Sequence, residues 1–186
     1  MSAAGPLRIA MWSGPRNIST AMMRAWENRT DCAVSDEPLY AAYLAATRLD
    51  HPARDEVVAA GETDWRRVAQ ALTQGPAPLG KAVWYQKHMT HHLLPGMATD
   101  WVHPLNNVFL IRDPAQVVES YLKSRATVEP EDIGLLQQER LFDEVAQRLG
   151  HAPPVIDADD FLRAPEAQTL AGTTHQRPFA RNTQIH

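Results

Sequence analysis

The residues best suited to chemistry lie in a turn near the N-terminus, where positions 12–20 read Trp-Ser-Gly-Pro-Arg-Asn-Ile-Ser-Thr. An apolar run precedes the turn and helical spacing follows it, so backbone N–H groups and the positive end of a helix converge there. Arg16 adds a full positive charge, and Ser19 and Thr20 add hydroxyl donors. This pattern predicts a binding site for an anion. The alternative is an ordinary turn whose hydroxyls cap the helix and whose arginine is solvated.

A second candidate anion contact follows the strongest strand signal of the chain, the apolar run at 107–111. Arg112 comes directly after this run, and Ser120 lies eight residues further on. A guanidinium group is a planar fork of donors that suits a phosphate. Taken singly, Arg112 could form a surface ion pair with Asp113 or Glu119, and Ser120 could be an ordinary hydroxyl on a helix face. Together with the N-terminal turn, the two residues favour a shared anion site.

Three histidines follow a predicted strand at 82–85, in the segment from Gln86 to His92. Imidazole titrates near neutral pH and therefore suits a general base, for which His88, His91 and His92 are the candidates. Their spacing could also bring them onto one helix face, where histidines bind zinc. We expect no metal site, because no cysteine lies beside them and no glutamate intervenes as in His-Glu-x-x-His. At least one of them is expected to be a solvated loop residue.

Two acidic residues, Asp36 and Glu37, follow a short predicted strand at 32–35. In an α/β sheet this position lies at the carboxyl ends of the strands, where ligands bind. Both residues are therefore candidates for contact with an acceptor amine or hydroxyl. Capping of the following helix, predicted at 39–49, explains them equally well. The sequence leaves both interpretations open.

The elements that must position these residues alternate between strands and helices. Short apolar runs predict strands, and apolar residues at helical spacing predict helices bounded by Asp, Pro and Gly. Strands are expected at 7–12, 32–35, 82–85, 107–111 and 154–156, and helices at 17–26, 39–49, 64–74, 114–122 and 130–149. This alternation predicts an α/β fold of three layers, with a mostly parallel sheet flanked by helices. We expect one domain over residues 1–168 and an irregular or disordered tail at 169–186.

The composition of the chain argues against nucleic acid and membranes as binding partners. With a formal net charge of −4 and a pI near 6.0, the chain is not a polycation that would bind nucleic acid or an anionic membrane in bulk. No apolar run approaches the roughly 20 residues that a membrane helix needs, and the N-terminus does not resemble a signal peptide. The single cysteine, Cys32, is expected in the core. We expect a cytoplasmic protein with a small-molecule partner, and a homodimer is compatible with the sequence.

Both anion-binding segments resemble those of the sulfotransferase family. The turn Pro15-Arg-Asn-Ile-Ser-Thr20 resembles the 5′-phosphosulfate loop of that family. The segment Phe109-Leu-Ile-Arg-Asp-Pro-Ala-Gln-Val-Val-Glu-Ser120 resembles its 3′-phosphate segment. The resemblance covers residues 7–168 and implies a P-loop NTPase-like fold. It also implies transfer of a sulfuryl group from 3′-phosphoadenosine 5′-phosphosulfate, without a metal, to a small hydroxyl or amine acceptor.

The resemblance also assigns site residues by position. The nucleotide contacts that it implies are Arg16, Asn17, Ser19, Thr20, Arg112 and Ser120. The residues of the turn would hold the 5′-phosphosulfate, and the last two would hold the 3′-phosphate. His88 is the nearest match to the family's general base, with His91 and His92 as rivals. Arg16, and in a lesser role Lys87, would stabilise charge on the leaving phosphate.

The sequence departs from the family pattern at Ile18, where the family has glycine, and at Ala21, where an aromatic residue often closes the motif. A basic loop that covers the 3′-phosphate is also missing, and we expect a truncation or a changed reading frame after about residue 168 to explain this. Two other functions stay open. One is a non-catalytic nucleotide-binding remnant of the fold, and the other is a P-loop kinase-like phosphotransferase. The turn lacks the Gly-Lys-Ser/Thr sequence that a kinase-like site needs.

Overall fold

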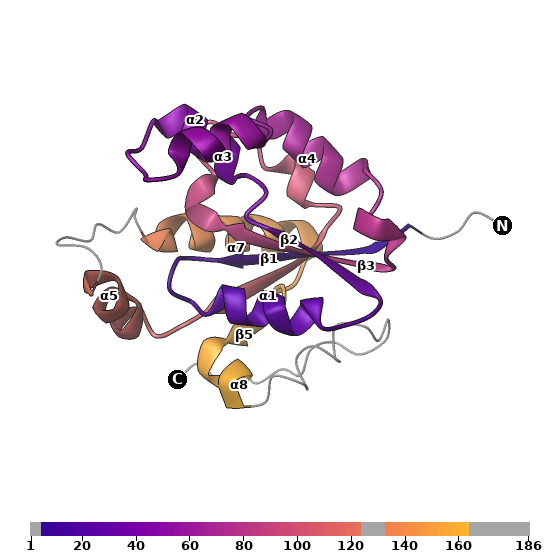
Figure 1. Cartoon of the computed structure of the whole chain (residues 1–186). Coiled ribbons are helices and arrows are strands. Elements are labelled where there is room, and N and C mark those ends of the chain that lie inside the picture. Colours follow the sequence, from indigo (N-terminus) through magenta and orange to yellow (C-terminus); the bar gives the residue numbers. More distant parts are fainter. Residues whose placement is uncertain (1–4, 124–132, 164–186) are drawn as a thin grey trace.

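The fold is built on a parallel sheet. The computed structural model describes residues 5–123 and 133–163 (Figure 1). Five strands in these residues lie in the order β2-β3-β1-β4-β5, and every pairing between them is parallel. The strands are β1 Leu7–Ser13, β2 Cys32–Asp36, β3 Val83–Met89, β4 Asn106–Ile111 and β5 Val155–Asp157. The predicted α/β class with a parallel sheet is confirmed.

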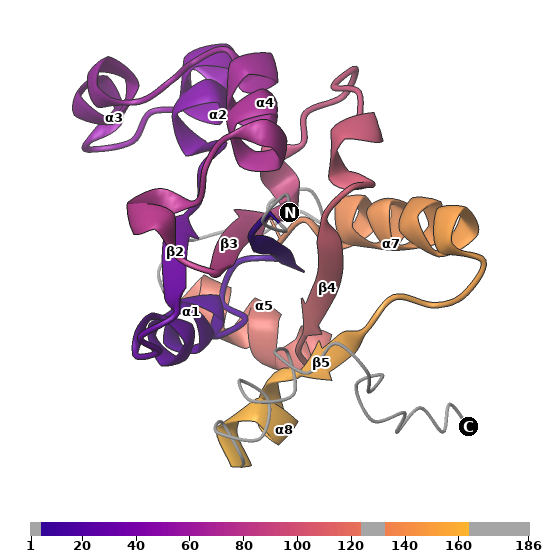
Figure 2. The same ribbon diagram turned by 90° about the vertical axis from the view of Figure 1, so that its right-hand side faces the viewer.

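Helices cover both faces of this sheet and complete the three layers. They are α1 Ser19–Glu27, α2 Tyr40–Thr47, α3 Arg54–Ala60, α4 Trp65–Gln74, α5 Pro114–Leu122, α7 Leu135–Leu149 and α8 Ala158–Arg163. Between α4 and β4 the described chain also contains three short 3₁₀ turns, η1 Pro78–Gly80 before β3, and η2 Thr90–His92 and η3 Asp100–Val102 after it. Helices α1 and α8 lie on one face of the sheet, and α4 and α7 lie on the other (Figures 1 and 2). Apolar side chains of these helices pack against the strands on both faces.

The central strand β1 illustrates why the sequence folds in this way. Successive strand residues point to opposite faces, so Ile9 and Met11 join the core under α1, while Ala10 and Trp12 join the core under α7. A strand covered on both faces is therefore apolar throughout. The one polar atom of Trp12 is satisfied, because its Nε1 donates to Asn107 Oδ1 at 2.8 Å.

Aspartate side chains cap two of the predicted helices. The Asp64 carboxylate accepts a hydrogen bond from the Arg66 N–H at 3.0 Å, and α4 follows directly. The Asp113 carboxylate accepts from the Ala115 N–H at 2.7 Å at the start of α5. Helix α1 begins at Ser19, later than the predicted residue 17.

The structure differs from the sequence prediction most in β3. The strand was predicted to end at residue 85, yet it continues to Met89 because its pairing with β1 runs on until Ser13 meets Met89. His88 therefore lies within the sheet and not in a loop. Residues 54–60, which lie outside the helices predicted from the sequence, form α3.

Parts of the prediction fall on residues that the structure does not describe. The described part of the helix predicted at 130–149 is α7, which begins at Leu135. The tail predicted at 169–186 lies outside the described residues. Among the helices of residues 5–123 and 133–163, none is both long and apolar enough to cross a membrane.

Candidate functional site

The turn between β1 and α1, residues 14–18, has an unusual backbone. Arg16 and Ile18 take left-handed conformations, with φ of 64° and 54°, and the intervening Asn17 does not. Residues other than glycine rarely adopt this region, and such strain is typical of functional turns. Gly14 is required because a Cβ there would collide with the Ile133 carbonyl oxygen. Alternating positive and negative φ directs successive N–H groups toward one point, which is the backbone form of an anion-binding nest.

The N-terminus of α1 opens onto this turn. Within the described part of the chain, no side chain caps the helix, whose N-cap residue is Ile18. The first N–H groups of a helix have no partner inside the helix, and they carry the positive end of its dipole. This helix end can therefore hold an anion.

Three of the predicted anion contacts come together at the turn. Arg16 donates from Nε to Ser120 Oγ at 3.2 Å and from Nη2 to the Ser120 carbonyl at 3.1 Å. Arg112 donates from Nη1 to the Arg16 carbonyl at 2.9 Å and from Nε to Gln116 Oε1 at 3.1 Å. These contacts join the β1–α1 turn to α5, so that two guanidinium groups share one region.

The ion pairs considered for Arg112 from the sequence are not formed. Asp113 caps α5, and Glu119 pairs with Lys123 at 3.3 Å. Neither Arg16 nor Arg112 has a carboxylate within ion-pair distance in residues 5–123 and 133–163. Arg16 is exposed, and Arg112 is half-buried. Their uncompensated charge makes the region attractive to an anion with more than one negative charge.

The other predicted nucleotide contacts are less accessible. Asn17 is buried, and its Nδ2 donates to the Leu110 carbonyl at 3.4 Å, which fastens the turn to the end of β4. Ser19 is buried at the first position of α1, whereas Thr20 is exposed. Asn17 therefore supports the turn, and the direct contacts predicted for these three residues stay predictions.

The position of the turn in the sheet is the one where α/β proteins bind ligands. From β1 the chain crosses first toward β2 and β3 on one side and later toward β4 on the other. Arg16 follows β1 and Arg112 follows β4, so they flank the point at which the strand order reverses. A crevice at the carboxyl ends of the strands is expected at such a point.

His88 is not brought to this region. Its side chain is 1% exposed and stacks on Trp12, with the ring centroids 4.3 Å apart, on the sheet face that carries α7. Burial lowers the pKa of His88 to about 3. Its Nε2 lies 3.3 Å from Gln86 Oε1. The role of general base stays a prediction for His88, and its burial and low basicity count against that role.

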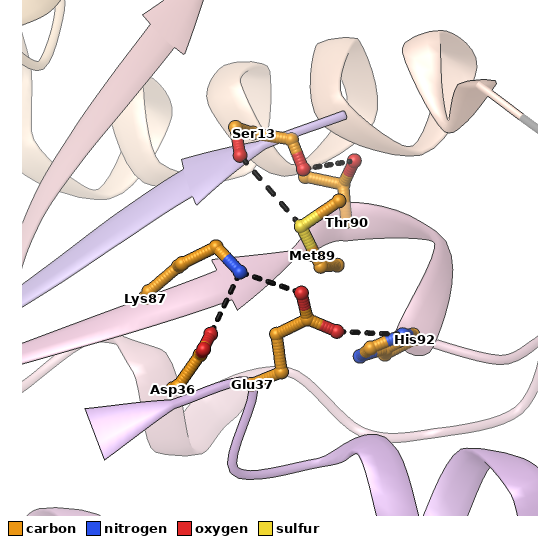
Figure 3. Close-up of polar contacts among 7 residues, drawn as sticks. All are labelled: Ser13, Asp36, Glu37, Lys87, Met89, Thr90 and His92. Atoms are coloured by element: carbon orange, nitrogen blue, oxygen red, sulfur yellow. Dashed lines mark hydrogen bonds and ion pairs between the residues drawn. The ribbon is translucent and has the colours of Figure 1, made fainter. Parts of the chain in front are cut away.

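A second polar cluster lies beside the turn, at the ends of β2 and β3 (Figure 3). The Lys87 ammonium is 3% exposed and contacts Asp36 Oδ1 at 2.7 Å and Glu37 Oε1 at 2.5 Å. The second Glu37 oxygen, Oε2, lies 3.9 Å from His92 Nε2. Both interpretations of the acidic pair were open from the sequence. The capping role is wrong, because neither carboxylate caps α2, and contact with an acceptor stays a prediction.

The two clusters are joined by the ends of β1 and β3. Thr90 Oγ1 donates to the Ser13 carbonyl at 3.3 Å, and the Ser13 hydroxyl contacts Met89 Sδ at 3.9 Å (Figure 3). Thr90 Oγ1 also donates to the Gly134 carbonyl at 2.9 Å. The start of α7 is thus held over the turn. The region of Arg16 and Arg112 therefore lies at the same edge of the sheet as the second cluster. We call this cluster of Lys87, Asp36, Glu37 and His92 the Lys87 cluster.

The histidines after β3 belong to an aromatic group and not to a solvated loop. The His92 ring stacks on Tyr40 with centroids 5.2 Å apart and lies 4.7 Å from Tyr43, while His91 lies edge-on to Tyr43. Burial, with His91 and other nearby positive groups adding to it, lowers the pKa of His92 to about 2. Sequence reasoning missed the two tyrosines. Their spacing of three positions on one helix face was the available signal.

We also searched the described residues for a metal-binding group and for cavities away from the two clusters. Among residues 5–123 and 133–163, no group of three or more His, Cys, Asp or Glu side chains could hold a metal ion. An open groove of about 590 Å³ between α4 and η3 is lined by Trp65 and Trp101, on the face opposite α1. It contains none of the predicted site residues. A much smaller hollow of about 30 Å³ lies against Arg112 and Asn17.

Comparisons with known proteins concern the family and the fold of the chain. Residues 7–175 match the family described as "Sulfotransferase domain". The chain is 34% and 36% identical to branched-chain-amino-acid aminotransferase-like proteins 2 and 1 of Arabidopsis thaliana, over 86% and 91% of its own length. It spans only 28% and 30% of those proteins. A sulfotransferase from Alicyclobacillus acidocaldarius shares its fold, with a TM-score of 0.63 at 10% identity, over 99% of this chain and 87% of that one.

Proposed function

Because the chain belongs to the sulfotransferase family, we propose that it transfers a sulfuryl group from 3′-phosphoadenosine 5′-phosphosulfate to a small hydroxyl or amine acceptor. The observation that carries this proposal is the meeting of Arg16, Arg112 and Ser120 at the reversal of strand order. Family membership and fold would not suffice alone, because one fold serves many functions.

The residues present fit a nucleotide with two separate anionic groups. Arg16 and the N–H groups of the β1–α1 turn suit the 5′-phosphosulfate, and Arg112 with Ser120 suits the 3′-phosphate. The bound nucleotide would supply the sulfuryl group and a phosphate leaving group. The contribution of this chain is fixed positive charge beside that phosphate. Such charge is the main catalytic need of phosphoryl transfer, which sulfuryl transfer resembles.

We assign the proton transfer to Glu37 in preference to His88. An acceptor hydroxyl loses its proton as it attacks sulfur, so the base must be accessible to the acceptor. His88 does not meet this condition, since it is 1% exposed and stacks on Trp12 within the core. The Glu37 side chain is 29% exposed at the same edge as the turn, and Lys87 holds it in position.

The test is calorimetric titration with 3′-phosphoadenosine 5′-phosphate, using ATP with Mg²⁺ as the control nucleotide. We expect micromolar binding of the former alone, and a loss of at least about tenfold in affinity, or about 1.4 kcal/mol, in Arg16→Ala. Arg67→Ala is the matched control, because Arg67 is an exposed arginine on α4. Circular dichroism would establish that both variants are folded. Unchanged affinity in folded Arg16→Ala would remove the central claim.

The burial of His88 supports one narrower function, nucleotide binding without turnover. A chain of this kind would bind 3′-phosphoadenosine 5′-phosphate as strongly as proposed but would consume no 3′-phosphoadenosine 5′-phosphosulfate with any acceptor. Transfer that is lost in Glu37→Gln and kept in His88→Phe would decide against this function and for the assignment of the base to Glu37.

A further inference from the structure

Helix α7, which packs beside β4 (Figure 2), carries a polar side chain where its pattern calls for an apolar one. Its buried residues are Gln138, Leu141 and Val145, which lie on one helix face at spacings of three and four. Leu141 and Val145 belong to the core, and Gln138, at 6% exposed, is buried almost as deeply. Burial of an amide costs free energy unless the amide is hydrogen-bonded, so a glutamine here needs a reason beyond packing.

The amide of Gln138 bonds to the end of strand β4. Its Nε2 donates to the Leu110 carbonyl at 2.9 Å, and Asn17 Nδ2 of the β1–α1 turn donates to the same oxygen at 3.4 Å. Helix α7, strand β4 and the turn therefore meet at one carbonyl. The bond from Gln138 has the ordinary length of a good hydrogen bond and is the shorter of the two, so it is the stronger hold on that carbonyl.

The place of this carbonyl in the sheet explains why side chains are its partners. The pairing of β1 with β4 ends at Trp12 and Phe109, and Leu110 lies one residue past that pair. Leu110 is fully buried, and a buried carbonyl must be hydrogen-bonded. The two amides therefore sit where β1 and β4 separate, which is the point of reversed strand order beside the proposed nucleotide site.

The position of Arg112 depends on this carbonyl. Arg112 follows Leu110 by two residues and directly precedes Asp113, whose carboxylate caps α5. Its Nη1 donates to the Arg16 carbonyl at 2.9 Å, and its side chain lines the same small hollow as Gln138. The backbone is thus held on both sides of Arg112, by the bond at Leu110 and by the helix cap. The place of the guanidinium group is therefore set by where the end of β4 is held.

We propose that Gln138 is a positioning residue of the nucleotide site, which holds the end of β4 so that Arg112 meets the 3′-phosphate. This inference rests on the proposed function and adds to it a residue that acts through the backbone and not by contact with the nucleotide. Without the amide of Gln138, the Leu110 carbonyl keeps the longer contact from Asn17, and the strand end is free to shift. A guanidinium group displaced from the phosphate loses the geometry of its hydrogen bonds, and affinity falls.

The test is titration of the full chain with 3′-phosphoadenosine 5′-phosphate, followed by calorimetry for tight binding and by NMR for weak binding. Gln138→Met keeps the length of the side chain and removes the amide, and it should bind the nucleotide at least about fivefold more weakly than the wild type. Gln147→Met is the matched control, because it makes the same substitution at an exposed position of the same helix. Its affinity should change by less than about twofold. Circular dichroism establishes that both variants are folded.

A double-mutant cycle separates positioning from a general loss of structure. Arg112→Ala removes the guanidinium group through which Gln138 acts, so adding Gln138→Met to it should weaken binding by less than about twofold. A residue that merely supports the fold would lower the affinity by the same factor in both backgrounds. Gln138→Asn is the second variant, which keeps an amide on a shorter side chain and should also lose affinity. It takes the place of Gln138→Met in the cycle if only the latter fails to fold.

The outcomes separate this inference from the proposed function. A loss of affinity in Gln138→Met that disappears in the Arg112→Ala background supports both. If the wild type binds the nucleotide, unchanged affinity of folded Gln138→Met, or an equal loss in both backgrounds, overturns this inference alone. Failure of both Gln138 variants to fold also overturns it alone, since Gln138 would then serve the fold and not the site. Absence of 3′-phosphoadenosine 5′-phosphate binding by the wild-type chain overturns the proposed function and the inference that rests on it.

Discussion

The Lys87 cluster allows a prediction about which of its charges is costly to leave unpaired. The Lys87 side chain is 3% exposed, whereas those of its partners Asp36 and Glu37 are 51% and 29% exposed. A buried ammonium without a partner is far from water. Carboxylates at this exposure remain hydrated when their partner is removed. The cost of breaking the cluster should therefore depend on which side is removed.

The magnitudes follow from this difference. An uncompensated buried charge costs about 3–5 kcal/mol, so Asp36→Ala/Glu37→Ala, which strands Lys87, should lower the free energy of unfolding by about 3 kcal/mol. Lys87→Met keeps the volume of the side-chain stem and leaves two hydrated carboxylates. The loss should then be about 1 kcal/mol, as for exposed ion pairs. Adding Lys87→Met to the double variant removes the stranded charge and should restore about 2 kcal/mol.

The assay is urea unfolding at pH 7, followed by circular dichroism, on the wild type and on the single, double and triple variants. Lys123→Met is the matched control, because the Lys123 side chain is 70% exposed, and it should change stability by less than about 0.5 kcal/mol. A triple variant no more stable than the double variant would refute the reasoning. Such a result would mean that water reaches the Lys87 ammonium.

Two further predictions concern the core histidines and the turn. Burial holds the pKa values of His88 and His92 near 3 and 2, while both bind protons near pH 6.5 in the unfolded chain. The unfolded state therefore gains protons first, and stability should fall by about 2 kcal/mol per histidine between pH 6.5 and 5. Urea unfolding at both pH values checks this, and His88→Phe or His92→Phe should weaken the dependence. Gly14→Ala would press a methyl group against the Ile133 carbonyl and should cost about 1–3 kcal/mol in a thermal unfolding scan, with Gly5→Ala, where a Cβ has room, as the control. Equal transition temperatures for these two variants would mean that the chain at Ile133 moves aside at no cost.

The fold class and the β1–α1 turn could be predicted because their signals are local. The apolar run of β1 breaks at Gly14, and helical spacing begins a few residues later. The same holds for the run of β4 and the cap at Asp113. These patterns indicate a strand, a turn and a helix without knowledge of any distant contact.

The environment of His88 could not be predicted because it depends on a distant strand. Gln86, Lys87 and His88 are polar and follow an apolar run, which is typical of a strand that has ended. In the fold, pairing with β1 extends β3 through these residues and buries all of them. The close contact of Arg16 with Ser120 is equally non-local, and only the order of β1 and β4 in the sheet explains it.

The parallel register of the central strand also has a consequence for synthesis of the chain. β1 emerges from the ribosome well before both of its neighbours, since Leu7 pairs with Val83 and Ile9 pairs with Asn106. Until β4 is complete, the backbone N–H and C=O groups along at least one edge of the apolar strand β1 have no partner strand. Pairing between strands so far apart in the sequence is slow. A nascent chain that stalls in this interval exposes a template for pairing with other chains. Fragments that end before residue 106 are therefore expected to aggregate instead of accumulating as folded pieces.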